Sequence, residues 1–441
     1  METIKHICAG CIGEPVLRLI VEAASSADFS CDYCTDGLAA TPISRVADRC
    51  GEVLKTFYED SSQAMAVVVY DYTPDGEDFP STIEKLALVS NDVAAEIVAA
   101  LEDEWPADPW FVQRKEVDSP WMWEWSQMEI SLRNEARFLN PHVADFMARI
   151  FGAIASDCTA DGAPVLVDAG PGTKHRAFYR ARVFQSDQEI EKALTHPEKC
   201  LGAPPGGVGS SGRMNAAGLP AFYGATLEKT ALAEVRPPVG SKVIVARFDL
   251  VRPLKLLNLV LLAQVQLPSG ASLFDTATLA AAQRRDFLRA LSEQMTVPVM
   301  PGDQDRNYLV TQVVADYLAM HPAAAIDGIL YPSVQVSKRK GDPNNMNVVL
   351  FHKAAFAIDS DSESATATAE LWTSHGEEGE EFDPKILRKV PKPPYRYQVN
   401  GFQPAPALKL VPDSMVIHKV AAVEIKTKPK AVRLVKTSVV S

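Results

Sequence analysis

Two closely spaced cysteine pairs, Cys8–Cys11 and Cys31–Cys34, constrain the N-terminal part of this chain more than any other feature. The 19 residues between the pairs fall within the spacing at which four thiolates converge on one metal ion. The helical pattern VLRLIVEAA spans the gap between them. We therefore expect a structural zinc site, closed by four protein ligands and without an open position for chemistry. The alternative is a set of unmetallated thiols packed in a core.

The number of cysteines and the N-terminal sequence indicate in which cellular compartment the protein is expected. Seven cysteines is an odd number, and the paired spacing favours metal ligation over disulfides in a reducing environment. Cys50, Cys158 and Cys200 are expected to be buried thiols. No secretory signal precedes the first cysteine pair, and the apolar stretch 254–268 is too short and too polar to cross a bilayer. We expect a cytoplasmic protein without a membrane partner.

Length and charge limit the function classes. At 441 residues the chain is long enough for two or three domains. Its 47% hydrophobic and 23% charged residues are typical of a globular protein. With 44 Lys and Arg against 56 Asp and Glu, the net charge of −12 makes nucleic acid an unfavourable partner.

The apolar pattern divides the chain into segments. It is helical up to about residue 151 and changes after residue 160 to short β-type runs mixed with helices, which predicts an α+β protein. We expect a zinc-knuckle-like segment at 1–40, a helical domain at 41–160 and an α+β core with mixed sheets at 170–357.

The C-terminal part divides by charge. Nine acidic residues and no Lys or Arg lie between Asp359 and Asp383, so we expect an unstructured acidic insertion at 358–384. From Lys385 to Ser441 there are twelve basic and two acidic residues in alternating runs. We interpret 385–441 as a β segment that completes the core, with a polyanion-binding patch as the alternative.

The helical region holds one short motif. Arg137 and His142 are spaced like the Rx4H motif of HEPN ribonucleases, although Pro141 interrupts the helix between them. The Cys-rich helical N-terminus also looks like the HEPN-type domain that precedes the catalytic domain in one subgroup of the family named below. Five of the six tryptophans lie between Trp105 and Trp125, a cluster that we expect to pack in a core.

A second set of residues suits a phosphate-containing ligand with a flat ring. Arg180 lies in FYRARVF and Arg213 in GRMNAAGLPAFYGA, and guanidinium groups match pyrophosphate oxygens well. Tyr223 lies on the short strand of that second run. Glu234 follows on the helix EKTALAEV, and a strand followed by a helix can return both side chains to one cleft.

These runs, together with IDGILYPSVQ, resemble the RES family, over roughly residues 177–351. The resemblance implies an ADP-ribosyltransferase-like fold and an enzyme that degrades NAD+ by cleaving its nicotinamide–ribose bond, with phosphate, water or a protein side chain as acceptor. Such enzymes usually act as toxins of toxin–antitoxin pairs. An ADP-ribosyltransferase that modifies a macromolecule and a HEPN-type ribonuclease are the alternatives.

The resemblance also implies residue roles. Arg180 and Arg213 would hold the pyrophosphate of NAD+, with Asn215 in the same loop, and Tyr223 would stack on the nicotinamide or its ribose. Glu234 would stabilise the oxocarbenium-like charge, a role that also follows from transition-state electrostatics.

The serine role of the family fits Ser333, and Thr311 is the alternative for it. NAD+ is thus the expected partner and substrate, zinc the only expected cofactor, and any antitoxin or regulatory protein a separate chain. A homo-oligomer stays open.

Overall fold

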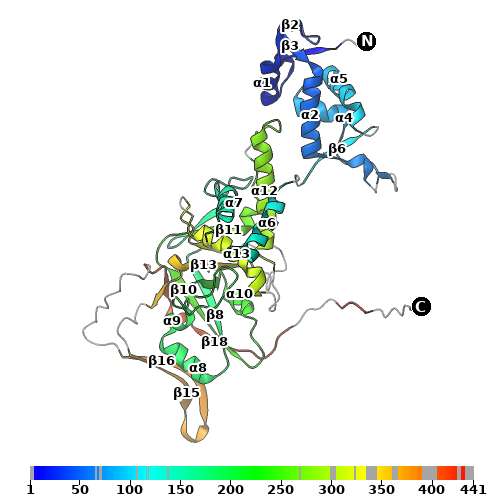
Figure 1. Ribbon diagram of the computed structural model, residues 1–441. Coiled ribbons are helices and arrows are strands. Elements are labelled where there is room, and N and C mark those ends of the chain that lie inside the picture. The colour runs from blue at the N-terminus through cyan, green and yellow to red at the C-terminus, as the bar shows by residue number, and fades with distance from the viewer. Residues whose placement is uncertain are drawn as a thin grey trace, which may run out of the picture. The chain divides into compact units, whose positions relative to one another are not determined.

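The computed structural model describes most of the chain, as two units (Figure 1). Unit 1 consists of residues 1–164 and 261–295, and unit 2 of residues 165–260 and 296–441. The segment 261–295, which we expected within the α+β core, thus belongs to unit 1. The residues outside the description are 1–3, 65, 66, 69–71, 106, 107, 116, 118, 137, 138, 268, 269, 298–303, 322, 323, 334–344, 360–365, 390–404, 425–428 and 433–441.

Unit 1 is mainly helical, as expected, but also contains two small sheets. Its helices are α1 (Pro15–Ala24), α2 (Ile43–Phe57), α4 (Phe79–Ala87), α5 (Asn91–Leu101), α6 (Trp121–Asn134), α7 (Pro141–Phe151) and α12 (Thr276–Gln294). The three-stranded sheets have the orders β1 (His6–Cys8), β3 (Ala39–Pro42), β2 (Ser26–Ser30) and β4 (Tyr58–Asp60), β6 (Trp110–Gln113), β5 (Glu77–Asp78). Buried apolar residues of α2, α4 and α5 form one core with Phe274 and Ala282.

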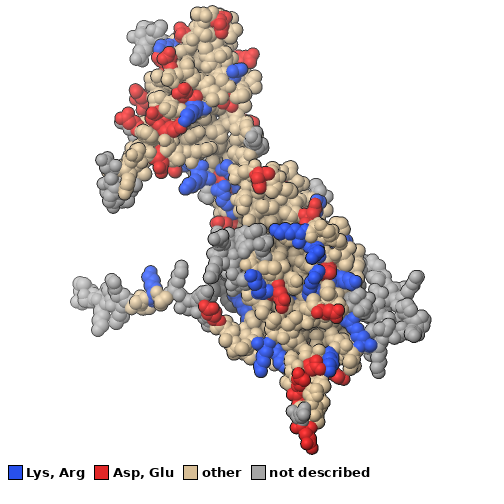
Figure 2. All heavy atoms as spheres, turned by 180° about the vertical axis from the view of Figure 1, so that it is seen from behind, with Lys and Arg blue, Asp and Glu red and all other residues tan. Residues whose placement is uncertain are grey.

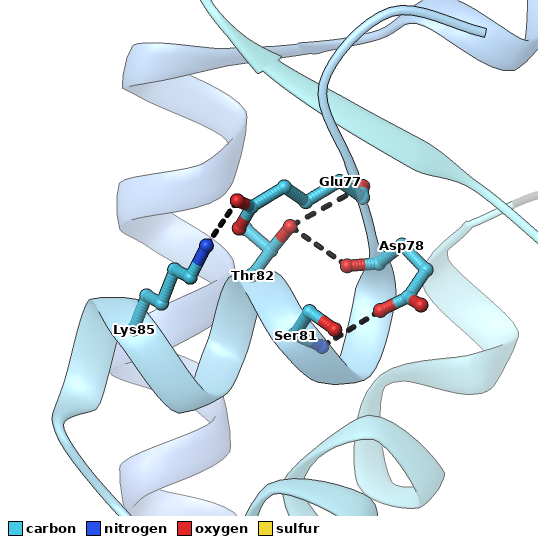
Figure 3. A network of polar contacts seen from close by, with 5 residues as sticks. All are labelled: Glu77, Asp78, Ser81, Thr82 and Lys85. Atoms are coloured by element: carbon cyan, nitrogen blue, oxygen red, sulfur yellow. Dashed lines mark hydrogen bonds and ion pairs between the residues drawn. The ribbon is translucent and has the colours of Figure 1, made fainter.

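The start of α4 shows how local sequence fixes a helix end in this unit (Figure 3). The carboxylate of Asp78 accepts a 2.8 Å hydrogen bond from the backbone N–H of Ser81, which would otherwise lack a partner. Hydrogen bonds from Ser81 lower the pKa of Asp78. The hydroxyl of Thr82 donates to the carbonyl of Asp78 at 2.8 Å, and Lys85 pairs with Glu77.

Two tryptophans of the cluster pack in a group of aromatic rings in unit 1. Trp121 and Trp125 pack on Phe146 of α7 and Phe287 of α12, with ring centroids 5.6–6.4 Å apart. This contact brings α6 and α7 together with α12, a helix more than a hundred residues later in the sequence. Trp123, by contrast, is exposed.

Unit 2 is built on a ten-stranded mixed sheet, in agreement with the α+β prediction. The strand order is β14 (Ala357–Asp359), β17 (Leu408–Leu410), β10 (Lys242–Leu250), β8 (Ala177–Phe184), β9 (Phe222–Ala225), β13 (Met346–Leu350), β12 (Gly328–Pro332), β11 (Leu254–Asn258), β7 (Leu166–Ala169). The pairs β11–β12 and β14–β17 are parallel, and the other neighbouring pairs in this order are antiparallel. The helices are α8 (Asp187–Thr195), α9 (Pro197–Leu201), α10 (Glu228–Glu234) and α13 (Gln304–Ala319), while α11 (Leu259–Leu262) lies where the chain passes between units.

The basic C-terminal segment contributes strands to this sheet. β17 and β18 (Val416–Lys419) both pair antiparallel with β10, at residues 248–250 and 242–245 respectively. Residues 177 to 184 of β8 pair along the other side of β10. Strands from two distant parts of the chain therefore flank β10.

The acidic segment is folded where the structure describes it, which corrects our expectation of an unstructured insertion at 358–384. β15 (Thr366–Ser374) and β16 (Glu380–Lys389) form an antiparallel hairpin. Trp372 and Phe382 pack edge to face with their ring centroids 5.1 Å apart, and the ammonium of Lys242 lies over both rings. The prediction was based on the number of acidic residues and did not consider the aromatic pair that packs across the hairpin.

Candidate functional site

A pocket of about 500 Å³ in unit 2 brings together most of the predicted site residues. It is lined by side chains from β8, β9, α10, β12 and α13 and from the loop before β9. The polar and charged residues of its lining are Arg180, Ser210, Ser211, Arg213, Asn215, Tyr223, Glu234, Arg236, Tyr308 and Tyr331. Its volume lies in the range typical of small-molecule and cofactor sites.

Arg180 on β8 gives the pocket wall an unsatisfied positive charge. Its guanidinium lies 5.1 Å above the ring of Phe222, and its Nη1 is buried without a hydrogen-bond partner. Burial, with a smaller contribution from Arg182, lowers the pKa of Arg180 to about 10. Arg180 thus remains charged near neutral pH, and a half-buried cation with a buried, unpartnered N–H group favours an anion beside it.

Arg213 lies in a loop that Tyr223 and Asn215 hold in place. The Tyr223 hydroxyl accepts from the backbone N–H of Met214 at 2.9 Å and donates to Oδ1 of Asn215 at 2.8 Å. The Asn215 amide donates at 3.1 Å to the carbonyls of three loop residues. The polar atoms of both side chains therefore form hydrogen bonds within the loop, although both side chains line the pocket.

Gly212 allows this close packing. A Cβ atom at this position would lie 2.4 Å from Oδ1 of Asn215 and 2.6 Å from the Tyr223 hydroxyl. No side chain fits at such distances without moving the tyrosine or the asparagine. The GR dipeptide at the start of the motif thus places an arginine directly after a residue that must lack a side chain.

Helix α13 holds the same loop from the other side. The Thr311 hydroxyl donates to the Arg213 carbonyl at 2.6 Å. The neighbouring Gln312 amide donates to Gly212 O at 2.8 Å, to the Ser211 hydroxyl at 2.9 Å and to Asn215 O at 3.0 Å. Thr311, the alternative residue for the serine role of the family, is buried and contacts the loop backbone.

Glu234 is the last residue of α10 and lies exposed in the pocket wall. Its Oε2 accepts a 3.1 Å hydrogen bond from the side-chain amide of Asn347 on β13. Burial and the negative charge of Glu234 raise the pKa of Tyr331 on β12, so this phenol stays protonated near neutral pH. The site therefore offers one carboxylate facing several cationic and phenolic groups.

Ser333 does not line the pocket. It follows β12, is 3% exposed, and its backbone N–H donates to the carbonyl of Asn345 at 3.1 Å. The sequence did not point to Tyr308, Tyr331 or Gln312, which α13 and β12 bring to the pocket or its loop. Tyr331 lies in the run IDGILYPSVQ, which resembles the RES family, so the sequence could have indicated it as a site residue.

Charge is divided unevenly between the units. Unit 1 has 14 Lys and Arg against 32 Asp and Glu, whereas unit 2 has 30 against 24. In Figure 2 acidic residues predominate on the visible face of unit 1, while both signs are interspersed on unit 2. The pocket with its arginines thus belongs to the unit with the basic excess, which favours an anionic ligand.

The four paired cysteines converge at one point in unit 1. Their Sγ atoms all lie within 4.8 Å of one another, with separations of 3.8 Å (Cys8–Cys11), 3.5 Å (Cys8–Cys34) and 3.7 Å (Cys11–Cys31). Four sulfurs bound tetrahedrally to zinc at ~2.3 Å would lie about 3.8 Å apart. The donor set and its spacing therefore fit a metal ion.

Backbone hydrogen bonds make one of these sulfurs a ready ligand. Burial raises the pKa of the Cys31 thiol, but hydrogen bonds from the N–H groups of Tyr33 and Cys8, at 3.4 and 3.3 Å, together with bonds to the Cys8 and Cys34 thiols lower it to about 7. Of the other cysteines, Cys50 is buried, Cys200 is half-buried and Cys158 is exposed, which corrects the expectation of a buried thiol at Cys158.

The Arg–His motif of the helical region is only partly described. His142 is exposed in the first turn of α7, which begins at Pro141. Arg137 lies outside the described residues.

None of the described helices is both long and apolar enough to span a bilayer.

Comparison with known proteins gives one match, to part of the chain. A search of curated proteins found no match. Residues 177–373 match the family model of the RES domain, a range that contains the whole pocket and leaves the helical N-terminal part uncovered. Residues 177–373, less than half of the chain, are thus similar to the RES domain.

Proposed function

We propose that unit 2 degrades NAD+ by cleaving the bond between nicotinamide and ribose. RES-domain enzymes generally process NAD+, and the pocket supports this substrate with arginines, tyrosines and a carboxylate in one wall. The observation that carries the proposal is Arg180, a half-buried cation whose buried Nη1 has no hydrogen-bond partner, in the wall of a pocket that also contains Arg213. A pyrophosphate supplies the missing negative charge.

The carboxylate of Glu234 acts where positive charge develops. As nicotinamide leaves, the ribose becomes oxocarbenium-like, and a fixed carboxylate stabilises that charge more than it stabilises the ground state. Tyr331 and Tyr308 provide flat rings and phenol groups along the same wall. Tyr223, whose hydroxyl is already used by the loop, acts mainly by keeping Arg213 in position.

The test is to mix purified protein with NAD+ in phosphate and in phosphate-free buffer and to identify the products by mass spectrometry. Free nicotinamide with ADP-ribose indicates hydrolysis, and ADP-ribose-1″-phosphate indicates phosphorolysis. Addition of an ADP-ribose mass to a protein or nucleic acid would instead support transfer to a macromolecule. Intact NAD+ under all conditions would refute the proposal. In cells we expect this activity to act as a toxin, neutralised by a separate antitoxin.

We further propose that Cys8, Cys11, Cys31 and Cys34 hold a structural zinc ion. The near-tetrahedral sulfur spacing supports this assignment. Four protein ligands leave no position for a reacting water, so the ion would join the end of β1 to the connection between β2 and β3 and take no part in NAD+ chemistry.

A further inference from the structure

Asn347 is a buried polar side chain that the roles assigned above leave unexplained. It lies on β13, is 2% exposed, and donates through Nδ2 to Oε2 of Glu234 at 3.1 Å. Its other polar atom, Oδ1, is buried without a hydrogen-bond partner. A buried carbonyl oxygen without a partner disfavours folding, so stability alone does not explain an asparagine here.

The register of the sheet places Asn347 next to the pocket. Tyr331 on β12 and Ala225 on β9 are its direct partners on the two neighbouring strands. Side chains of directly paired residues share one face of a sheet, and Tyr331 lines the pocket. Asn347 therefore reaches Glu234 from the sheet face on which the pocket lies.

Glu234 needs such a partner because of where it lies. It is exposed and ends α10, and the carbonyl dipoles at a helix C-terminus repel a carboxylate. A lysine or arginine at position 347 would hold the carboxylate but also neutralise it. A neutral amide fixes the carboxylate and leaves its negative charge available to a developing cation.

We propose that Asn347 is a positioning residue that fixes Glu234 through Oε2 and leaves Oε1 to face the substrate. Its catalytic consequence rests on the proposed NAD+ cleavage, whereas the contact itself does not. The other charged or titratable groups around the pocket are Arg180, Arg213, Tyr223, Arg236, Tyr308 and Tyr331.

The decisive variant is Asn347→Asp, which keeps the shape and replaces the donor by a second carboxylate. At pH 8 we expect kcat to fall about tenfold or more while KM for NAD+ changes by less than about twofold. The activity relative to wild type should recover as the pH is lowered towards 5.5, because two adjacent carboxylates then share a proton and the hydrogen bond is restored. A purely structural role would not reverse the pH dependence.

Asn345→Asp is the matched control. Asn345 lies two residues earlier, is also buried, and accepts through Oδ1 from the Thr230 hydroxyl at 2.7 Å, a bond that aspartate retains. We expect near wild-type kcat and no pH reversal for this variant. Wild-type kcat in Asn347→Asp at pH 8, or an equal loss in both variants, would overturn the positioning role.

A crystal structure of Asn347→Leu separates this proposal from the proposed function. The leucine removes the donor without adding charge, and we expect the Glu234 carboxylate to leave its position or become disordered. An unmoved carboxylate would refute the positioning role even if wild-type protein cleaves NAD+. A displaced carboxylate in a protein that leaves NAD+ intact would uphold the contact and refute only the NAD+ function. Should Asn347→Leu not fold, Asn347→Ser serves the same comparison.

Discussion

The hydroxyl of Thr311 donates a 2.6 Å hydrogen bond to the backbone carbonyl of Arg213, 98 residues earlier in the chain. Together with Gln312, this bond attaches the arginine loop to α13. The loop is therefore held by side chains and not only by its own turns. The position of Arg213, which we propose binds the pyrophosphate, thus depends on a helix that lacks a recognisable motif.

The Thr311 bond can be tested with two substitutions of similar size. Thr311→Val removes the hydroxyl and keeps the volume, so the loop loses one hydrogen bond worth about 1 kcal/mol and KM for NAD+ should rise roughly fivefold. Thr311→Ser keeps the hydroxyl and should stay close to wild type. Steady-state kinetics of both variants give the comparison, and equal KM values in the two would show that the bond does not position Arg213.

Glu234→Gln tests the carboxylate directly. The amide keeps the shape but removes the charge that stabilises the oxocarbenium-like ribose, so NAD+ cleavage should slow roughly a hundredfold or more. Binding of ADP-ribose, which lacks the nicotinamide leaving group, should change little. Undiminished NAD+ loss in this variant would remove Glu234 from the mechanism.

The hydroxyl of Tyr223 should contribute to the stability of unit 2 and to NAD+ binding, because it holds the loop of Arg213. Tyr223→Phe leaves the N–H of Met214 and Oδ1 of Asn215 without their partner, which should destabilise unit 2 by about 1–3 kcal/mol and weaken NAD+ binding. Gly212→Ala should act in the same direction, because its Cβ would overlap the same hydroxyl. Thermal unfolding and KM measure the two effects. A Tyr223→Phe protein with wild-type stability and KM would contradict the role of this hydroxyl in holding the loop.

The sequence brings predicted site residues to one pocket where the motif residues are close together in the chain. Tyr223 and Glu234 lie on a consecutive strand and helix, and Arg213 lies in the loop just before them, so local pattern sufficed. Asn347 and Gln312 come from elements about a hundred residues further on. Their contacts depend on strand order and helix packing, which apolar periodicity does not determine.

The prediction of an unstructured acidic segment was wrong because composition does not show which residues outside the segment pack on it. Composition gave the segment between Asp359 and Asp383 too little apolar surface to fold alone. In the structure its fold is held by a partner outside the segment, because Lys242 of β10 covers Trp372 and Phe382. The cysteine site was the opposite case, since the spacing of the two pairs already determined which atoms meet.

The zinc assignment predicts one zinc ion per chain. Elemental analysis should give a ratio near one in wild type and a clear loss in Cys31→Ser, while Cys158→Ser, at an exposed cysteine, should retain the metal. Structural zinc contributes on the order of 10 kcal/mol to the folding of such sites, so chelation should unfold the segment around β1 and β3. Metal-free protein with unchanged stability would refute the site.

The last prediction separates the pocket of unit 2 from the Arg–His motif of unit 1. If expression arrests growth, Arg213→Ala should relieve the arrest, because loss of a charged hydrogen bond to the pyrophosphate costs about 1.5–3 kcal/mol, or roughly a tenfold to hundredfold loss of binding. His142→Ala should leave both the arrest and the depletion of cellular NAD+ unchanged, since His142 belongs to unit 1 and is not among the residues that line the pocket of unit 2. Growth, NAD+ content and RNA integrity are measured in the same cultures. Relief by His142→Ala together with restored RNA, and continued arrest in Arg213→Ala, would identify a ribonuclease instead.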